Sequence, residues 1–155
     1  MKKSLVALLL VAAFYSNAQV EISAKYDNIG KFHNGVAIVE LRGKRGAINM
    51  EGKELIKPEW DNLTGFGEDG IGFARRNGLV GLIKTDGTII VEPAYHRISD
   101  FKNGRAIVTK GIFKGVIDST GKILIEPKYE HLNFEDNGLV RAKVGGKEVL
   151  LKITN

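Results

Sequence analysis

The chain has 155 residues, of which 43% are apolar and 26% charged, and its formal charge is +5. This composition is ordinary for a single globular domain and excludes a disordered chain. The absence of cysteine excludes disulfides, thiolate metal sites and a lipid-modified cysteine anchor. The positive charge is small and dispersed, which excludes the dense basic patch of a nucleic-acid-binding protein.

The N-terminus has the three-part layout of a secretory signal peptide. Two lysines precede an apolar run, Leu5–Phe14, which is too short to cross a bilayer as a helix. Ser16 and Ala18 then place small residues at the −3 and −1 positions of a cleavage site before Gln19. We therefore expect an exported protein, periplasmic or extracellular, without stable membrane insertion after cleavage. The expected organisation is a signal peptide over 1–18 and a single domain over 19–155.

An aromatic residue recurs at intervals of 34 or 35 residues through the rest of the chain. This first aromatic series consists of Tyr26, Trp60, Tyr95 and Tyr129. Three more series keep the same register: Phe32, Phe66, Phe101 and Phe134; the glycine of a Gly-apolar-Ile motif at Gly46, Gly81 and Gly115; and Pro58, Pro93 and Pro127. Agreement of several residue types in one register indicates an internal repeat.

Each unit contains three segments with the pattern of β-strands. Alternation of small apolar with bulkier or charged residues is typical of a strand with two different faces. Strand one is predicted over 36–41, 71–75, 105–110 and 139–144, strand two over 47–50, 82–85, 116–119 and 149–153, and strand three over 54–57, 89–92 and 123–126. Gly-containing turns separate the strands, and the proline is expected to end the third, because it cannot donate to the ladder.

These segments predict an all-β fold of about four tandem three-stranded units. The last unit has no third strand, whereas residues 20–22 align with strand three of the other units. Two arrangements follow. In the one we favour, the units form an open solenoid-like stack with these strands at its ends. In the alternative, the N-terminal strand completes the last unit of a closed propeller-like ring.

The units resemble the WG-repeat family of bacterial proteins over roughly residues 26–153. The third unit shows the pattern best, as Phe101-Lys-Asn-Gly104-Arg-Ala106-Ile-Val108 followed by Gly115-Val-Ile117-Asp-Ser-Thr-Gly121-Lys-Ile-Leu-Ile-Glu-Pro127. The tryptophan that names the family is missing, because Arg45, Val80 and Lys114 precede the strand-two glycines. The resemblance implies a β-repeat architecture and no single activity. By analogy with bacterial surface repeats, it implies binding of cell-wall polymers or proteins.

The sequence offers few groups for chemistry. His33, His96 and His131 share no register, so no metal site is predicted, and no nucleophile motif or cofactor motif is present. The stretch from Gly65 to Gly70 is interpreted as a widened turn rather than a phosphate-binding loop. The arginine- and lysine-rich turn at 42–45 is interpreted as a solvated hairpin tip.

Two repeated features have structural interpretations. Asp27, Asp61 and Glu130 directly follow the leading aromatic, with His96 at the same place, and are expected to be solvated or ion-paired, one in each unit. Both aromatic series are expected to form the core.

The expected function is therefore a non-catalytic module that binds or scaffolds a protein or a cell-envelope polysaccharide. The candidate partner-binding residues are charged residues that vary between units: Arg75, Arg76, His96, Arg97, Arg105 and Arg141. One alternative is a carbohydrate- or peptidoglycan-active enzyme, for which two carboxylates from different units must share a cleft. Another is an inhibitor or immunity-like partner of a secreted protein, which would have one strongly asymmetric face.

The signal peptide gives a direct prediction about processing. Protein recovered from the cell envelope should begin at Gln19, because signal peptidase cuts after the small residues at −3 and −1. Intact-mass spectrometry of the envelope fraction measures this. A mass that includes Met1 would contradict the prediction.

Overall fold

The computed structural model describes residues 25–136 and 138–153. The predicted cleavage site and the predicted strand at 20–22 lie outside these residues. In the described part of the chain, no helix has the length and apolar character needed to cross a membrane.

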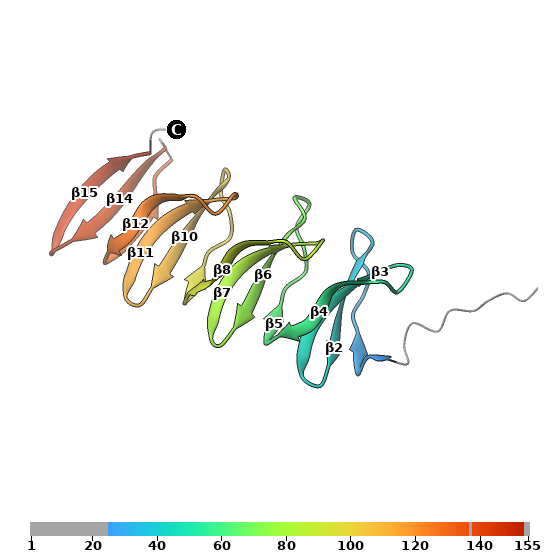
Figure 1. The fold of residues 1–155 in the computed structure, drawn as a ribbon. Helices are drawn as coiled ribbons and strands as arrows, with labels where there is room; N and C mark the ends of the chain where they lie inside the picture. The colour runs from blue at the N-terminus through green and yellow to red at the C-terminus, as the bar shows by residue number, and fades with distance from the viewer. Residues whose placement is uncertain (1–24, 137, 154–155) are drawn as a thin grey trace, which may run out of the picture.

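The described residues form four antiparallel sheets that follow one another along the chain, and we call each sheet a unit (Figure 1). Unit one contains β1 (Asn28–Ile29), β2 (Val36–Leu41), β3 (Lys44–Asn49) and β4 (Glu54–Trp60). Unit two contains β5 (Asn62–Leu63), β6 (Ile71–Arg76), β7 (Leu79–Lys84) and β8 (Ile89–Tyr95). Unit three contains β9 (Arg97–Ile98), β10 (Arg105–Lys110), β11 (Phe113–Asp118) and β12 (Ile123–Tyr129). Unit four contains β13 (His131–Phe134), β14 (Leu139–Val144) and β15 (Lys147–Lys152).

Each unit has one strand more than predicted, so that the first three units have four strands and the fourth has three. The additional strand follows the leading aromatic and is short, as in β5, where Asn62 pairs with Arg75 and Leu63 with Ala74. Two residues are too few to show a period-two alternation, so the sequence pattern could not reveal this strand. Strand one was placed correctly to within one residue, whereas strand two begins earlier than predicted, by three residues in the first three units and by two in unit four.

The prediction that proline ends the third strand was wrong. The strand β4 continues through Pro58 to Trp60, and β8 and β12 pass through their prolines in the same way. Proline is tolerated because β4, β8 and β12 are outer strands of their sheets and because the register of pairing shifts at the proline. Arg45 pairs with Trp60 and Ala47 with Ile56, so β4 has two more residues than β3 over this stretch. Such a bulge leaves residues without a ladder partner and bends the strand.

The bent strand crosses directly over the glycine of the Gly-apolar-Ile motif. A Cβ atom built on Gly46, Gly81 or Gly115 would lie 2.7, 2.8 and 2.8 Å from the nitrogen of the proline in the same unit. Backbone atoms cannot approach a side chain so closely, and glycine is therefore required at each crossing. The recurrence of glycine and proline in the sequence has this single steric cause.

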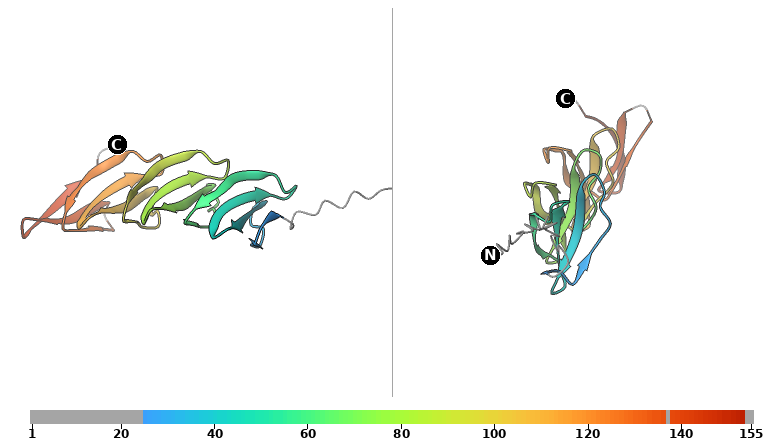
Figure 2. Two further views of the ribbon diagram at one scale, coloured as in Figure 1. Left: turned by 60° about the horizontal axis from the view of Figure 1, so that its bottom comes forward. Right: turned by 90° about the vertical axis from the view of Figure 1, so that its right-hand side faces the viewer.

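The four sheets lie in an open row, and the first and last units are at opposite ends (Figures 1 and 2). No sheet closes on itself, and the first and last strands of each sheet are not paired with each other. The view along the row shows successive sheets one behind the other (Figure 2, right). This arrangement agrees with the open stack and not with the closed ring.

Apolar clusters between consecutive sheets hold the stack together. Trp60, 2% exposed, packs with Ile83 between units one and two. Tyr95 packs with Val108 between units two and three, and Tyr129 packs with Val140 between units three and four. The first aromatic series thus forms core, as predicted, and each later member lies at the junction with the next unit. A further cluster, which includes Val39, lies on the outer face of unit one with Tyr26 beside it.

The strand-one to strand-two hairpins have two-residue turns, and three of them have positive φ at both residues. The φ angles are 53° and 78° at Asn77 and Gly78, and 57° and 76° at Gly145 and Gly146. This backbone matches the right-handed twist of the flanking strands. The prediction of tight Asn-Gly and Gly-Gly turns is therefore confirmed.

Replacing Ile83 should test the burial of strand two. Ile83 is 1% exposed and lies in the cluster between units one and two. Ile83→Ala should reduce the free energy of unfolding by roughly 2–5 kcal/mol in denaturant titrations, because it leaves a cavity in a packed core. The matched control is Ile89→Ala in the same unit, where the side chain is 38% exposed. Equal losses for the two variants would contradict the observed face of β7.

Candidate functional site

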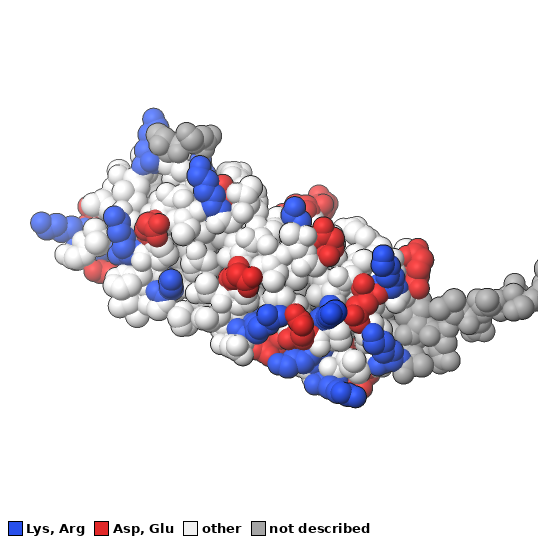
Figure 3. Space-filling model, viewed as in Figure 1, with Lys and Arg blue, Asp and Glu red and all other residues white. Residues whose placement is uncertain are grey.

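Basic and acidic side chains are interspersed on the face of the stack shown in Figure 3. They are most dense towards the end where unit one lies, and much of the middle of this face is uncharged. Recognition by bulk charge of one sign is therefore not a property of this face. The polar contacts of individual residues must be followed instead.

The residue that follows each leading aromatic accepts a hydrogen bond from a hairpin turn. Carboxylate oxygens of Asp27, Asp61 and Glu130 accept the N–H of the first turn residue in their own units, at 2.6, 2.7 and 3.0 Å. In unit three, Nδ1 of His96 accepts the N–H of Gly111 at 3.0 Å. The four residues share a capacity to accept, and this explains why a histidine takes the place of a carboxylate. The expected one-per-unit distribution is confirmed, and the role is to fix the turn.

His96 is therefore accounted for as a turn residue rather than a free partner-binding group. The three histidines are exposed, and His131 lies on β13 rather than in a loop. Within residues 25–136 and 138–153, no group of three His, Cys, Asp or Glu side chains could hold a metal ion.

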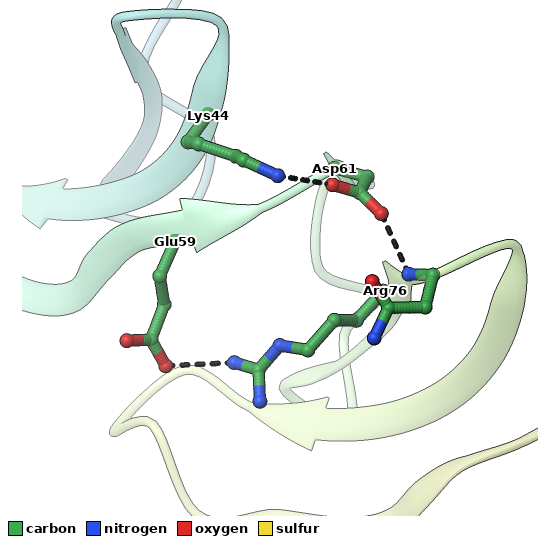
Figure 4. Close-up of polar contacts among 5 residues, drawn as sticks. Lys44, Glu59, Asp61 and Arg76 are labelled. Carbon is green, nitrogen blue, oxygen red and sulfur yellow. Dashed lines mark hydrogen bonds and ion pairs between the residues drawn. The ribbon is translucent and has the colours of Figure 1, made fainter.

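Arg76 belongs to a polar clasp that joins units one and two (Figure 4). Its guanidinium pairs with Glu59 of β4 at 2.7 Å and lies 4.0 Å from the centre of the Trp60 ring. Lys44 of unit one pairs with Asp61 of unit two in the same clasp. Residues 42–45 are exposed at a hairpin turn, as predicted, and the side chains of Lys44 and Arg45 in addition contact Asp61 and Asn62 of unit two. Arg76 is likewise engaged within the chain.

Arg141 lies on the outer face of unit four, where it binds two carboxylates. Its guanidinium pairs with Glu135 at 2.8 Å and Glu148 at 3.4 Å, and the hydrogen bond that it donates to Glu135 is the main cause that raises its pKa. Arg141 is paired across the sheet with Leu150, at the position where Phe73 pairs with Leu82 in unit two. An apolar pair in unit two is thus replaced by a charged cluster in unit four.

Arg75 and Arg97 are brought together, although they come from different units. Both line a cavity of about 140 Å³ between units two and three. Arg75 lies on β6, where its Nη1 donates to the carbonyl of Gly78 at 2.9 Å. Arg97 lies on β9 and is exposed. The remaining lining residues are polar or apolar but not acidic: Asn62, Thr64, Phe73, Val80 and Ile98.

A second cavity, of about 460 Å³, adjoins the first, since Thr64 and Phe73 line both. Its walls are the loop from Gly65 to Asp69 in unit two and the segment Asp100–Phe101 in unit three. We call the two cavities together the junction groove. The widened turn predicted at 65–70 thus forms one wall of it.

The second aromatic series contributes to surface cavities as well as to the core. Phe32 is 41% exposed, and Phe66, Phe101 and Phe134 are half-buried. Phe66 and Phe101 line the junction groove, and Phe134 lines cavities at the next junction. The prediction that both series are core holds in part for this one, because Phe66, Phe101 and Phe134 also pack against the core clusters, whereas Phe32 is exposed.

Arg105 lies at the junction between units three and four. It lines one cavity of about 250 Å³ with Phe134 and Glu135, and another of about 380 Å³ with Asp118 and Lys122. Each of these cavities contains a carboxylate beside the arginine. Among the cavities that the described residues form, the one that Arg75 and Arg97 share has no carboxylate in its lining. Arg97 also lines a cavity of about 290 Å³ between units three and four, together with Asp100.

Sequence reasoning missed the other polar residues of the groove. Thr64 and Ser99 hold equivalent positions in units two and three, and their hydroxyl oxygens accept the N–H of Phe73 and of Ile107, both at 2.9 Å. Of the two, Thr64 lines the junction groove and Ser99 lines a cavity between units three and four. Their shared register was the available signal. Asp69 and Asp100, which face the second cavity from two units, are at unrelated positions, so no repeat pattern could have paired them.

The turn contact of Asp61 gives a pH-dependent prediction. The ion pair with Lys44 and then the N–H of Asn77 hold the pKa of Asp61 below its ordinary value. A lowered pKa contributes stability above the unfolded-state value, and this contribution is lost as the pH falls through the folded-state value. Asp61→Ala should therefore lower the thermal midpoint at pH 7, and its difference from the unaltered protein should shrink below about pH 4.

Asp61→Asn is the matched control, because an amide oxygen can still accept the turn N–H but cannot pair with Lys44. It should retain slow hydrogen exchange at the Asn77 amide, whereas Asp61→Ala should lose it. A pH-independent difference between Asp61→Ala and the unaltered protein would count against the ionic part of this contact.

Two solved structures show a distant likeness to the fold. One is Kluyveromyces lactis Hsv2, with 14% identity and a TM-score of 0.40 over 77% of this chain and 48% of that one. Another is a protein of unknown function from Bacteroides caccae, with 17% identity and a TM-score of 0.32 over 82% of this chain and 56% of that one. This chain thus spans about half the length of each. No curated protein sequence matches the chain.

The family comparison is much more specific. The family model described as WG containing repeat matches four consecutive stretches, residues 16–44, 46–79, 81–111 and 115–147. Three of these begin at the glycines over which the third strand crosses, so the family pattern coincides with the steric requirement seen in the structure. The chain therefore belongs to the WG-containing repeat family.

Proposed function

We propose that this protein is an exported, non-catalytic repeat module that binds a protein or a cell-envelope polymer. The observation that carries the proposal is the junction groove, in which two arginines from neighbouring units line a cavity without a carboxylate partner. Charged groups that serve only the fold are normally paired, as Arg76 and Arg141 are here. Two arginines that share a cavity with apolar side chains and no carboxylate are typical of a binding surface on an extended repeat stack.

Export rests on the N-terminal sequence alone. The lysine pair, the short apolar run and the small residues before Gln19 are arranged as in a secretory signal peptide. The lack of cysteine is compatible with an oxidising compartment, because no free thiol is present to react.

A hydrolase is the second candidate, because Asp69 and Asp100 come from different units and line one cavity. A glycosidase needs one carboxyl group that is kept protonated and one that is ionised, which requires two different environments. Both side chains are exposed, and Oδ1 of Asp69 already accepts the N–H of Ile71 at 3.0 Å within its own loop. These contacts favour the binding module over the enzyme.

Affinity capture distinguishes the two functions. The protein should be expressed from its full sequence with a C-terminal tag and incubated with the envelope fraction of its own cells. A binding module should retain one partner at near-stoichiometric yield, and bait that has been heat-denatured should lose it. The outcome that contradicts the proposal is release of soluble fragments from envelope polymer by the unaltered protein, together with its loss in Asp69→Asn and Asp100→Asn.

A further inference from the structure

The smaller cavity of the junction groove is lined by polar groups that are left with hydrogen atoms to donate. Oδ1 of Asn62 already accepts from Nη1 of Arg45 at 2.6 Å, which leaves its NH2 group to donate. Oγ1 of Thr64 already accepts the N–H of Phe73 at 2.9 Å, which leaves its hydroxyl hydrogen. The two guanidinium groups have donors only. The cavity is therefore complementary to a group that only accepts, and an anion is such a group.

The positive charge at this junction is not balanced by the cavity lining. Arg75 occupies the position of Glu40 in unit one, and Arg97 occupies the position of Asn62 in unit two. The first junction thus has an acidic and a neutral residue where the second has two arginines. Like charges that line one small cavity repel each other, and an anion bound between them relieves the repulsion.

The apolar walls favour an organic carboxylate over an inorganic anion. Phe73, Val80 and Ile98 line the same cavity as the two arginines. A fully hydrated phosphate or sulfate gains nothing from such walls, whereas the carbon atoms that bear a carboxylate bury apolar surface against them. Arginine also matches the planar carboxylate through paired N–H donors.

The second cavity has the opposite polarity. Asp69 and Asp100 line it together with Phe66 and Phe101, so the groove has donors in one cavity, carboxylates and aromatic side chains in the other, and Phe73 in the lining of both. A polymer of uronic acids carries negative charge along its whole length and would be repelled by the two aspartates. An extended peptide with a terminal carboxylate, an apolar last residue and a basic residue upstream meets all three parts of the groove.

We propose that the junction groove binds the free carboxyl terminus of a partner protein, with Arg75 and Arg97 holding the carboxylate. This inference rests on the proposed binding function and names the chemistry of its ligand. The apolar last side chain lies against Phe73 and Phe101. The two aspartates select a lysine or arginine a few residues upstream.

The first test uses the unaltered protein, so it does not depend on the folding of a variant. Amide chemical shifts are recorded by NMR during titration with N-acetyl-phenylalanine and with N-acetyl-phenylalaninamide, its neutral counterpart. Shifts should appear at the amides of 73–80 and 97–101, and the acid should bind at least about tenfold more tightly than the amide, as expected of charge-assisted hydrogen bonds. Equal binding of the two, or no shift with about 20 mM acid, overturns the proposal.

The second test uses a pool of pentapeptides with lysine at the first position and a free carboxylate after an apolar last residue. Arg75→Gln and Arg97→Gln should each weaken binding of the pool by about tenfold or more. Arg42→Gln is the matched control, since Arg42 is exposed in the hairpin of unit one and lines neither cavity of the groove. Equal loss in all three variants overturns the proposal. The proposal is also overturned, in favour of a uronic acid polymer, if trigalacturonate binds more tightly than the peptides and Arg97→Gln abolishes that binding.

The capture experiment separates this inference from the broader proposal. If the double variant of Arg75 and Arg97 still retains an envelope partner, the binding function stands and the proposal about the junction groove is overturned. Release of envelope fragments by the unaltered protein would overturn the binding function itself.

Discussion

In the first three units, the last strand (β4, β8 or β12) must cross over a strand of its own sheet at a position that has no side chain. Gly46, Gly81 and Gly115 leave room for this crossing, and a proline lies directly above each of them. The bulge at the crossing bends the strand and places its last residue at the next junction. Trp60, Tyr95 and Tyr129 are delivered in this way into the apolar clusters between units. One steric requirement thus determines both the shape of each unit and the contact that stacks it on the next.

The junctions between units differ chemically, because equivalent positions in successive units hold different residue types. The first is joined by an ionic clasp that includes Lys44 and Asp61, and the second has the two arginines of the groove. The outer face of the last unit has Arg141 bound to two carboxylates in place of an apolar pair. The two kinds of position are therefore distinct along the stack. The repeated apolar positions stabilise it, and the variable polar positions give each junction its own surface.

The residue before each strand-two glycine links the family pattern to the groove. Arg45, Val80 and Lys114 occupy the position of the family's tryptophan, and they pair across the sheet with Trp60, Tyr95 and Tyr129. Val80 lines the cavity that contains Arg75 and Arg97. A tryptophan has a much larger side chain and would occupy part of that space. The departure from the family motif at Val80 is thus the same feature that keeps this cavity open.

The sequence by itself determined the repeat, its register, strand one, the tight hairpins and the buried aromatic series, because these depend on contacts within one unit or on one periodic residue type. Only the tertiary structure decided the rest. The short strands β1, β5 and β9 have only two residues each, which is too few for a pattern in the sequence. The path of β4 through Pro58 depends on a register shift against β3. The meeting of Arg75 with Arg97 depends on the offset between stacked sheets, since these residues hold different positions in their units. Turn contacts such as Asp61 to Asn77 join residues on separate segments, and their geometry is set when the hairpin folds back beside the leading aromatic.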